Sequence, residues 1–264
     1  MSLENKVAIV TGSTAGIGGE IAVQLAEQGA RVVITSRDIT RAEDKVAEIR
    51  KSGGDGLAIS YRLESPSELV SLIEKTMDTY GRLDILVNNA VSHPTVPTVP
   101  IQELTHEQLN LGINTNLTNV LALTCKAYPY LKESGGNILN IGSVSVNQHY
   151  IGIPLYTIIK GGMSQMTKVL ASEWAPDVRV NQINPGFTRT AAYKEIGIPE
   201  EAFDGVEATF RRFYPLNRTG SPQDTASVAA FMVSGQASWI TGAEINVDGG
   251  YSIRGTSLND NSLF

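Results

Sequence analysis

A tyrosine and a lysine four residues apart could together perform acid–base chemistry. Tyr156 and Lys160 lie at the start of an expected helix, where a spacing of four puts both side chains on one face. A phenol has a pKa of about 10, and a nearby ammonium group favours its ionised form. The pair could therefore give a proton to a carbonyl oxygen or take one from an alcohol. Without further context, a simple pair on a helix surface explains the same spacing.

A serine upstream of this pair supplies that context. Ser143 follows an apolar run at 137–141, which predicts a strand, and precedes Tyr156 by thirteen positions. In open parallel sheets, ligands bind beyond the carboxyl ends of the strands. Ser143 is therefore expected at the same edge of the sheet as the tyrosine and lysine.

A glycine-rich turn follows the first expected strand, Val7–Val10. The run Thr11-Gly-Ser-Thr-Ala-Gly-Ile-Gly18 carries glycines at 12, 16 and 18 and leads into a helical pattern. Glycines allow a sharp turn and close approach of a ligand, and a helix N-terminus favours phosphate. The spacing differs from the best-known dinucleotide fingerprint, and a tight strand-to-helix connection is the alternative. The strand–turn–helix context favours a pyrophosphate site.

The end of the second strand predicts which dinucleotide binds. The run Val32-Val-Ile-Thr-Ser-Arg37 places neutral Ser36 and then a cation where an acid would contact the ribose of NAD. The planar guanidinium of Arg37 suits the 2′-phosphate of NADP. Asp38 lies one position later and could instead contact the ribose of NAD, so NAD is the less favoured alternative. Arg37 could also be an ordinary solvent-exposed cation with no part in cofactor binding.

The elements that must position these residues alternate regularly. Strands are expected at 7–10, 31–35, 56–61, 83–88, 137–141, 178–183 and 244–247, and helical patterns at 17–28, 41–51, 66–80, 106–133 and 155–175. Continuous apolar strands between amphipathic helices predict an α/β fold: a single-domain Rossmann-type doubly wound parallel sheet with helices on both faces. No change of composition divides residues 1–264.

Composition excludes several classes of function. Of 264 residues, 42% are hydrophobic, 18% are charged, and the net charge is −6. Disorder is therefore excluded, and with no basic stripe neither nucleic acid nor an anionic membrane is an expected partner. The single cysteine, Cys125, offers neither an internal disulfide nor a metal site. We see neither a signal peptide nor an apolar run long enough to span a membrane, and we expect a cytoplasmic protein without a metal.

Taken together, the ordered motifs resemble the short-chain dehydrogenase/reductase family. Besides the glycine turn, Ser143 and the tyrosine–lysine pair, the chain contains Leu86-Val-Asn-Asn-Ala90, Asn116, Asn184-Pro-Gly186 and a closing segment at 239–250. The resemblance covers residues 5–250. It implies hydride transfer between a nicotinamide cofactor, NADP by the argument above, and a small ketone or secondary alcohol, in a homodimer or homotetramer. The helical patterns at 106–133 and 155–175 would form the subunit contacts.

The resemblance also implies residue roles. Tyr156 would be the general acid/base, and Ser143 would hydrogen-bond the substrate oxygen. Lys160 would bind the nicotinamide ribose and lower the pKa of Tyr156. Asn116 would hold a water that links Lys160 to solvent, with Asn114 as the rival for this role. The residues expected along the cofactor are Gly12, Ser13, Thr14, Gly16, Ile17, Gly18, Ser36, Arg37, Leu63, Asn89, Ala90, Tyr156, Lys160, Pro185, Gly186 and Thr188.

Two positions depart from the family pattern. Val91 stands where a glycine usually follows Asn-Asn-Ala, and it adds bulk beside the cofactor. Arg62 stands where an aspartate usually meets the adenine; it could lie over the adenine or add charge near the 2′-phosphate. A catalytically silent, NADP-binding regulator or scaffold is therefore the alternative function.

The substrate is expected between 91–100, 144–155 and an insertion at 187–221. The insertion carries aromatic residues at helical spacing, including Phe203 and Phe210, and Tyr193 lies before them. We expect a substrate lid over a fairly apolar carbonyl or alcohol; the alternative is that the aromatic stripe only packs on the domain. The polar C-terminal tail, 251–264, is expected either to be mobile or to dock on a neighbour.

Overall fold

A seven-stranded parallel sheet forms the centre of the computed structural model, which describes residues 2–190 and 199–254. The strand order is β3-β2-β1-β4-β5-β6-β7. The strands are β1 (Val7–Val10), β2 (Arg31–Ser36), β3 (Asp55–Ser60), β4 (Ile85–Asn88), β5 (Asn137–Ile141), β6 (Arg179–Pro185) and β7 (Glu244–Val247). This arrangement confirms the predicted doubly wound fold, and each expected strand forms within two residues of its expected limits.

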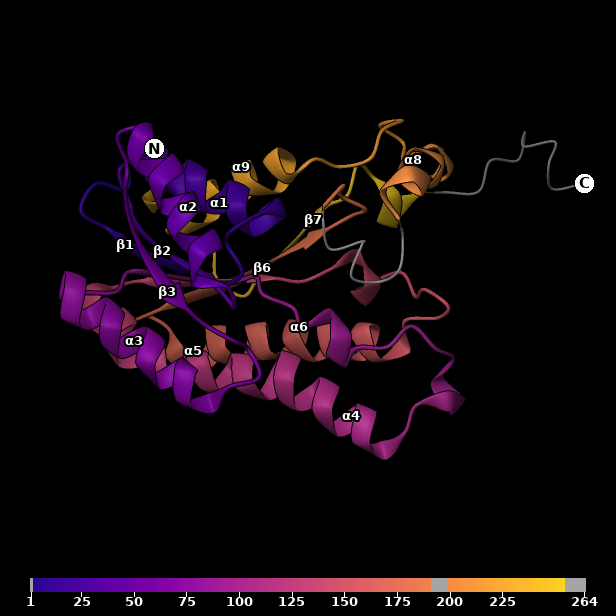
Figure 1. The fold of residues 1–264 in the computed structure, drawn as a ribbon, viewed down its shortest axis with the longest axis horizontal. Coiled ribbons are helices and arrows are strands. Elements are labelled where there is room, and N and C mark those ends of the chain that lie inside the picture. Colours follow the sequence, from indigo (N-terminus) through magenta and orange to yellow (C-terminus); the bar gives the residue numbers. More distant parts are fainter. Residues whose placement is uncertain (1, 191–198, 255–264) are drawn as a thin grey trace, which may run out of the picture.

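Helices cover both faces of the sheet (Figure 1). Above it in this view lie α1 (Gly16–Glu27), α2 (Ile39–Lys51) and α9 (Pro222–Val233); below it lie α3 (Pro66–Tyr80), α5 (Asn119–Ser134) and α6 (Pro154–Trp174). Each layer encloses its own core, with Ile21 and Leu25 of α1 on one side and Leu72 and Leu123 on the other. Strands buried on both faces need apolar residues throughout, which explains their unbroken β-branched runs.

The expected helix over 106–133 contains a break in its regular pattern. It comprises α4 (His106–Ile113), a π-helical turn at Asn114–Thr118, and α5. In the π turn the amide of Asn119 donates to the carbonyl of Asn114, five residues back. A hydrophobic period of 3.6 residues predicts the helix but not this local change of winding.

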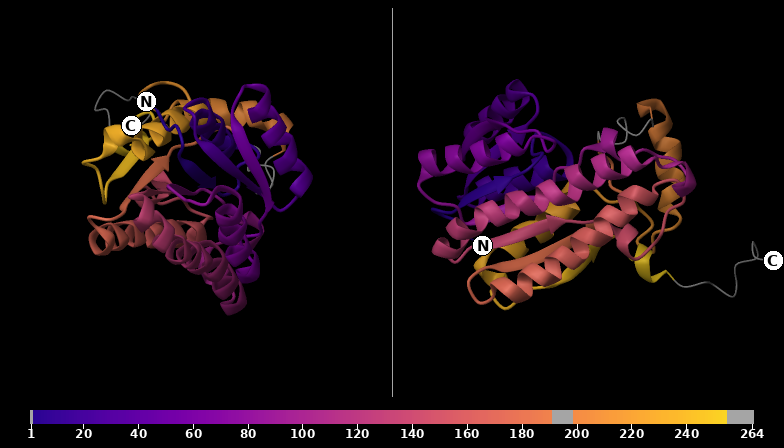
Figure 2. Two further views of the ribbon diagram at one scale, coloured as in Figure 1. Left: turned by 90° about the vertical axis from the view of Figure 1, so that its left-hand side faces the viewer. Right: turned by 90° about the horizontal axis from the view of Figure 1, so that it is seen from below.

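The insertion at 187–221 contributes a short helix, α8 (Phe203–Arg211), at one end of the molecule (Figure 2). Phe187, Phe203 and Tyr214 are buried in a small aromatic cluster, with Phe210 and Tyr251 packed against it. The structure therefore shows the stripe packing internally. Residues 191–198 of the expected lid, including Tyr193, and residues 255–264 of the expected tail lie outside the described residues.

The topology places one edge of the sheet at a switch point. From β1 the chain proceeds outward through β2 to β3, then returns to β4 on the other side of β1. The connection after β1 therefore leads to one side of the sheet and the connection after β4 to the other, which leaves a crevice beyond the carboxyl ends of these two strands. The glycine turn after β1, Asn89 and Ala90 after β4, and Ser143 after β5 all lie at this edge.

Candidate active site and cofactor cleft

A cleft of about 590 Å³ lies along this edge of the sheet. At one end it is lined by the glycine turn and by Arg37, and at the other by Ser143, Tyr156 and Lys160. Its volume falls within the range of small-molecule and cofactor sites. The residues predicted from separate motifs are thus brought together in one cleft.

The glycine turn adopts the backbone that its sequence predicts. Gly12 and Gly16 have φ of +65° and +58°, angles that favour glycine. A Cβ at Gly18 would lie 2.3 Å from Asn89 Nδ2 and 2.5 Å from the Gly12 carbonyl oxygen. Asn89 Nδ2 donates to the carbonyls of Thr11 and Gly12 at 2.9 and 3.1 Å. Asn89 therefore holds the turn in shape while it also lines the cleft.

Helix α1 begins without a side-chain cap, at the place where a pyrophosphate is expected. Its N-cap, Ala15, supplies no side-chain acceptor, and its first turn contains no acidic residue. The first backbone N–H groups of a helix have no partner within it, and they carry a partial positive charge. Gly12, Thr14, Gly16, Ile17 and Gly18 line the cleft here. These residues fit an anionic phosphate group.

Ser13 lies beneath the turn and does not line the cleft, so its contact with the cofactor stays a prediction. Its side chain is fully buried, donates to the carbonyl of Val10 at 2.7 Å, and accepts from the amide of Thr35 at 3.0 Å. Thr35 in turn accepts from the amide of Gly12 at 2.9 Å. The Ser13 hydroxyl therefore joins the turn to β2.

The end of β2 presents two cations to the cleft. Ser36, Arg37 and Arg41 all line it, and Arg41 lies in the first turn of α2. Asp38 instead caps α2, since its Oδ1 accepts from the amide of Thr40 at 3.0 Å. The carboxylate that kept NAD as an alternative is therefore engaged in a helix cap. We did not single out Arg41, although its position one turn after Arg37 could have indicated it.

Arg62 lies outside the cleft lining, so its contacts support neither of the two places that we considered for it. Its backbone amide and Nε donate to the carboxylate of Glu68 at 2.7 and 2.8 Å, so the side chain is tied to α3, outside the cleft. Leu63 does line the cleft, as predicted, and so does Glu64, which accepts a hydrogen bond from Ser92. Sequence reasoning missed Glu64 because it belongs to no motif.

Tyr156 and Ser143 meet at the other end of the cleft. The Ser143 hydroxyl lines the cleft beside Tyr156 and accepts from the amide of Ser145 at 3.1 Å. Burial raises the pKa of Tyr156, although the neighbouring Ser143 hydroxyl acts in the opposite direction. The phenol is therefore protonated at neutral pH and lies beside a second hydroxyl, which suits proton donation to an oxygen held between them.

Lys160 is deeply buried and lines the cleft together with Tyr156. Its Nζ donates to the carbonyl of Ile141 at 2.7 Å and lies 5.7 Å from the centroid of the Tyr156 ring. Burial lowers the pKa of Lys160 to about 8. The pKa of Tyr156 is raised and not lowered as we expected, because burial has the largest effect on the phenol.

Asn116 lies within the π turn but does not line the cleft. Its Oδ1 accepts from the amide of Ser92 at 2.8 Å, and its Nδ2 donates to Thr95 Oγ1 at 2.8 Å and to the carbonyl of Gly112 at 3.1 Å. The side chain therefore anchors the loop that follows β4. A water held by Asn116, or by the rival Asn114, stays a prediction.

The remaining predicted cofactor residues lie at or just beyond the carboxyl ends of β4 and β6. Ala90, Pro185, Gly186 and Thr188 line the cleft, together with Val91, which adds its side chain to the wall without closing it. Beyond Tyr156, the lining is largely apolar. Its side chains come from three segments of the chain and include Val96, Val144, Ile153, Phe187 and, from helix α8, Phe210.

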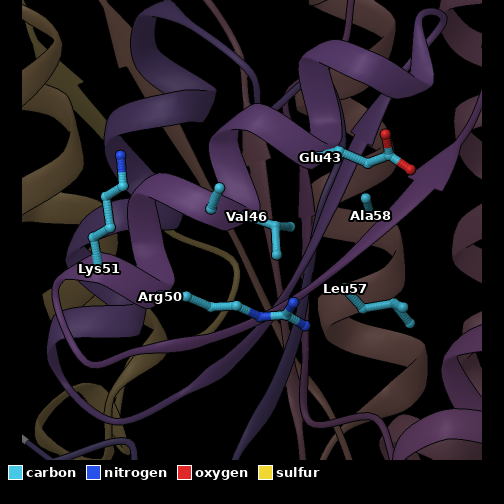
Figure 3. A pocket seen from close by; sticks show the side chains of 7 residues that line it. Glu43, Val46, Arg50, Lys51, Leu57 and Ala58 are labelled. Atoms are coloured by element: carbon cyan, nitrogen blue, oxygen red, sulfur yellow. The ribbon is translucent and has the colours of Figure 1, made fainter.

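A second hollow lies on the outer side of α2 and β3 and offers no comparable chemistry (Figure 3). Glu43 and Lys51 lie on opposite sides of it, and Arg50 Nη2 donates to the carbonyl of Gly56 at 2.8 Å. Across residues 2–190 and 199–254 we find no cluster of three metal-ligating side chains. The helices in the same residues are too short or too polar to cross a membrane.

Comparison with known proteins identifies the family. The family model described as enoyl-(acyl carrier protein) reductase matches residues 12–252. An uncharacterised oxidoreductase of Methylorubrum extorquens is 37% identical over 250 residues, which cover 94% of this chain and 98% of the relative. The short-chain dehydrogenase/reductase SDRA of Arabidopsis thaliana is 35% identical over 252 residues, which cover 96% of each chain. The chain belongs to the short-chain dehydrogenase/reductase family. It is therefore an oxidoreductase of a family that uses a nicotinamide cofactor, and the predicted resemblance is confirmed.

Other relatives carry different substrate names. Tropinone reductase-like 3 of Erythroxylum coca is 35% identical, over 94% of this chain and 93% of its own. A crystal structure of a putative gluconate dehydrogenase from Agrobacterium tumefaciens has a TM-score of 0.86 at 33% identity, covering 95% and 97% of the two chains. The 3-ketoacyl-(acyl-carrier-protein) reductase of Brucella melitensis, solved with NADH, has a TM-score of 0.84 at 33% identity, covering 95% and 100%. The names of these three relatives refer to three different substrates. The comparisons therefore do not identify the substrate of this chain, which must be inferred from the residues of its own cleft.

Proposed function

We propose that this protein is an NADP(H)-dependent oxidoreductase that interconverts a ketone and a secondary alcohol, with Tyr156 as general acid/base. The observation that carries the proposal is the grouping of Ser143, Tyr156 and the buried Lys160 in the lining of one cleft, at one of its ends. The other end begins at the uncapped helix α1. A nicotinamide cofactor bound along this cleft would supply the hydride in reduction and accept it in oxidation.

Each residue of the site has a task in this mechanism. The Ser143 hydroxyl positions the substrate oxygen against Tyr156, which donates its proton as the carbonyl becomes an alcohol. The ammonium group of Lys160, 5.7 Å from the phenol ring, stabilises the phenolate that is left. In the reverse direction the phenolate removes the proton of the alcohol.

We propose NADP as the cofactor because two cations face the same end of the cleft. Arg37 and Arg41 line it, whereas Asp38 caps α2. Charge-assisted hydrogen bonds to a 2′-phosphate contribute about 1.5–3 kcal/mol each, or about one to two decades in affinity. We therefore expect Arg37→Ala and Arg41→Ala each to weaken NADPH binding about tenfold or more and leave NADH binding nearly unchanged. Equal losses for both cofactors would refute the assignment.

The substrate that best fits the cleft has an apolar group next to its carbonyl. The lining beyond Tyr156 consists largely of aliphatic and aromatic side chains, including Ile153 and Phe210. Phe210, from α8, stacks on Phe187 with ring centroids 4.4 Å apart. We propose that α8 forms part of a lid, which would close over such a group and exclude water.

The proposed mechanism is tested with Tyr156→Phe. We expect this variant to bind NADPH as the wild type does and to lose turnover on a panel of apolar ketones by about 10³-fold or more, because the proton donor is gone. Retained turnover would refute the role of Tyr156. A wild type that binds NADPH but oxidises it with no ketone of the panel would favour the regulator or scaffold.

We also propose that the chain self-associates through the face formed by α4, α5 and α6. Large apolar side chains on these helices remain exposed in the single chain: Leu111, Leu121, Ile158 and Val169. Exposed apolar side chains on neighbouring helices are typical of a contact surface. Pairing with a second copy would cover them in the homodimer or homotetramer predicted from the sequence.

A further inference from the structure

A row of polar side chains crosses the sheet below the catalytic end of the cleft. Asn88 of β4, Asn140 of β5, Gln182 of β6 and Glu244 of β7 occupy successive paired positions. The three amides are buried, and 18% of the Glu244 side chain remains exposed. Buried amides of this kind need matched partners, because an unpaired polar group in the interior is costly.

The hydrogen bonds along this row give each amide a defined orientation. Asn88 Nδ2 donates to Asn140 Oδ1, and Gln182 Nε2 donates to Asn184 Oδ1, both at 2.8 Å. Glu244 ends the row as a group that only accepts. Its Oε2 faces two donors, Asn184 Nδ2 at 3.4 Å and Gln182 Nε2 at 3.5 Å.

Helix α6 holds the other oxygen of the same carboxylate. Glu244 Oε1 accepts from Ser164 Oγ and from Lys168 Nζ, each at 2.7 Å. Burial acts to raise the pKa of Glu244, but hydrogen bonds from Lys168, Ser164 and Asn184 outweigh it, and the pKa lies below its ordinary value. The group is therefore an ionised acceptor in a fixed place.

The row reaches the active site through Asn184. Asn184 Oδ1 accepts from the backbone amide of Ser143 at 3.2 Å. Gly142, just before Ser143, lets the amides pack directly beneath the backbone, since a Cβ there would lie 2.2 Å from Asn184 Oδ1 and 2.5 Å from Gln182 Nε2. The position of Ser143 is thus set by side chains that do not themselves line the cleft.

We propose that Glu244 and Asn184 are positioning residues for Ser143. The NH₂ group of Asn184 faces both the carboxylate of Glu244 and Asn246 Oδ1, at 3.4 and 3.2 Å. This leaves the amide oxygen of Asn184 to face the Ser143 N–H. If the amide turned over, its NH₂ group would oppose that N–H, and Ser143 would shift relative to Tyr156. The inference rests on the proposed oxidoreductase function, because it assigns these residues an effect on turnover.

The first test replaces the acceptor with an amide of the same shape. In Glu244→Gln, an NH₂ group can face the NH₂ group of Asn184, which favours the turned amide. We expect kcat to fall about tenfold, equivalent to one hydrogen bond, while the Kd for NADPH stays within about twofold. Glu48→Gln is the matched control, because Glu48 pairs with Lys45 on the outer surface of α2 and should change neither value.

The second test restores the pattern from the other side. Asn184→Asp keeps an oxygen toward Ser143 but places another against Glu244, so this variant alone should lose activity. Combined with Glu244→Gln, the new carboxylate can accept from the new amide. We expect the double variant to recover kcat to within about threefold of the wild type. If the two residues had only a structural role, the losses of kcat in the two single variants would add in the double variant.

Hydrogen exchange of the Ser143 amide, followed by NMR, tests the same contact without turnover. We expect exchange about tenfold faster in Glu244→Gln and restored protection in the double variant. If the wild type reduces no ketone, the proposed function fails, while this measurement still decides the positioning. If Glu244→Gln does not fold, Ser164→Ala, which keeps the carboxylate, should lower kcat about threefold with Kd unchanged. Unchanged kcat and exchange in the folded variants would overturn the proposal, as would additive losses in the double variant.

Discussion

The close approach between Gly18 and Asn89 makes Gly18→Ala a direct test of the cofactor site. The new Cβ would lie 2.3 Å from Asn89 Nδ2 and 2.5 Å from the Gly12 carbonyl oxygen. Either neighbour must move by about 1 Å to reach ordinary contact distances. The Asn89 side chain can move, but only by losing its bonds to the Thr11 and Gly12 carbonyls. The Gly12 oxygen belongs to the glycine turn itself, so its movement reshapes the phosphate site.

The magnitude follows from these two effects. Overpacking costs about 1–3 kcal/mol, and each lost hydrogen bond contributes about 1 kcal/mol. We expect the free energy of unfolding to fall by about 3–5 kcal/mol, which lowers the Tm by about 6–20 °C for a domain of this size. A displacement of about 1 Å in a binding site can cost about 10²-fold, so NADPH affinity should fall by about that factor.

The assay is a fluorescence titration with NADPH beside a thermal melt. Gly205→Ala is the matched control, because Gly205 lies in helix α8 with nothing within 4 Å of the added methyl group. The control should bind NADPH normally and melt at or slightly above the wild-type temperature. The reasoning fails if Gly18→Ala binds NADPH within twofold of the wild type, because the turn would then tolerate a displacement that we consider damaging.

Three further predictions concern other parts of the molecule. Since burial lowers the pKa of Lys160 to about 8, ketone reduction should decline above pH 8 as the ammonium group is lost; a flat profile to pH 10 would remove its role. Asp84→Asn should lower the free energy of unfolding by about 2 kcal/mol, since the Asp84 carboxylate is buried and binds Lys6, Arg82 and the amide of Val7, although both cations are partly in water. Burial acts to raise the Asp84 pKa, but these partners hold it below its ordinary value. Their contribution to stability is therefore present above about pH 4 and is lost as the pH falls. Urea melts from about pH 3 to 7 should show that the free energy of unfolding depends less on pH in the variant than in the wild type. Light scattering should give a mass of two or four chains, and Leu111→Glu with Ile158→Glu should reduce it; an unaltered mass would exclude this face from the contact.

The sequence predicts the fold and most of the cleft because both depend on local patterns. Apolar strands such as Val7–Val10 alternate with amphipathic helices, and the glycines of the turn adopt angles that few other residues accept. Ser143, Tyr156 and Lys160 come together because each follows or starts an element at the same edge of the sheet.

The contacts that the sequence does not predict depend on how side chains turn in the folded chain. Arg62 binds Glu68, and Ser13 bonds to the backbone of β2 beneath the turn. Spacing alone cannot show that Lys160 turns toward Ile141, or that burial dominates the pKa of Tyr156. Glu244 escaped notice because its importance depends on pairing between β6 and β7.

The π turn at Asn114–Thr118 fixes the number of residues in this segment more strictly than it fixes which residues they are. An α-helix turns by about 100° per residue, so deleting one residue here would restore regular winding but rotate α5 relative to α4 by about that angle. The face of α5 that carries Val120 and Leu123 would leave the core, or Asn116 would leave the loop it anchors. Relatives of this protein should therefore tolerate substitutions within the turn more readily than a change in its number of residues.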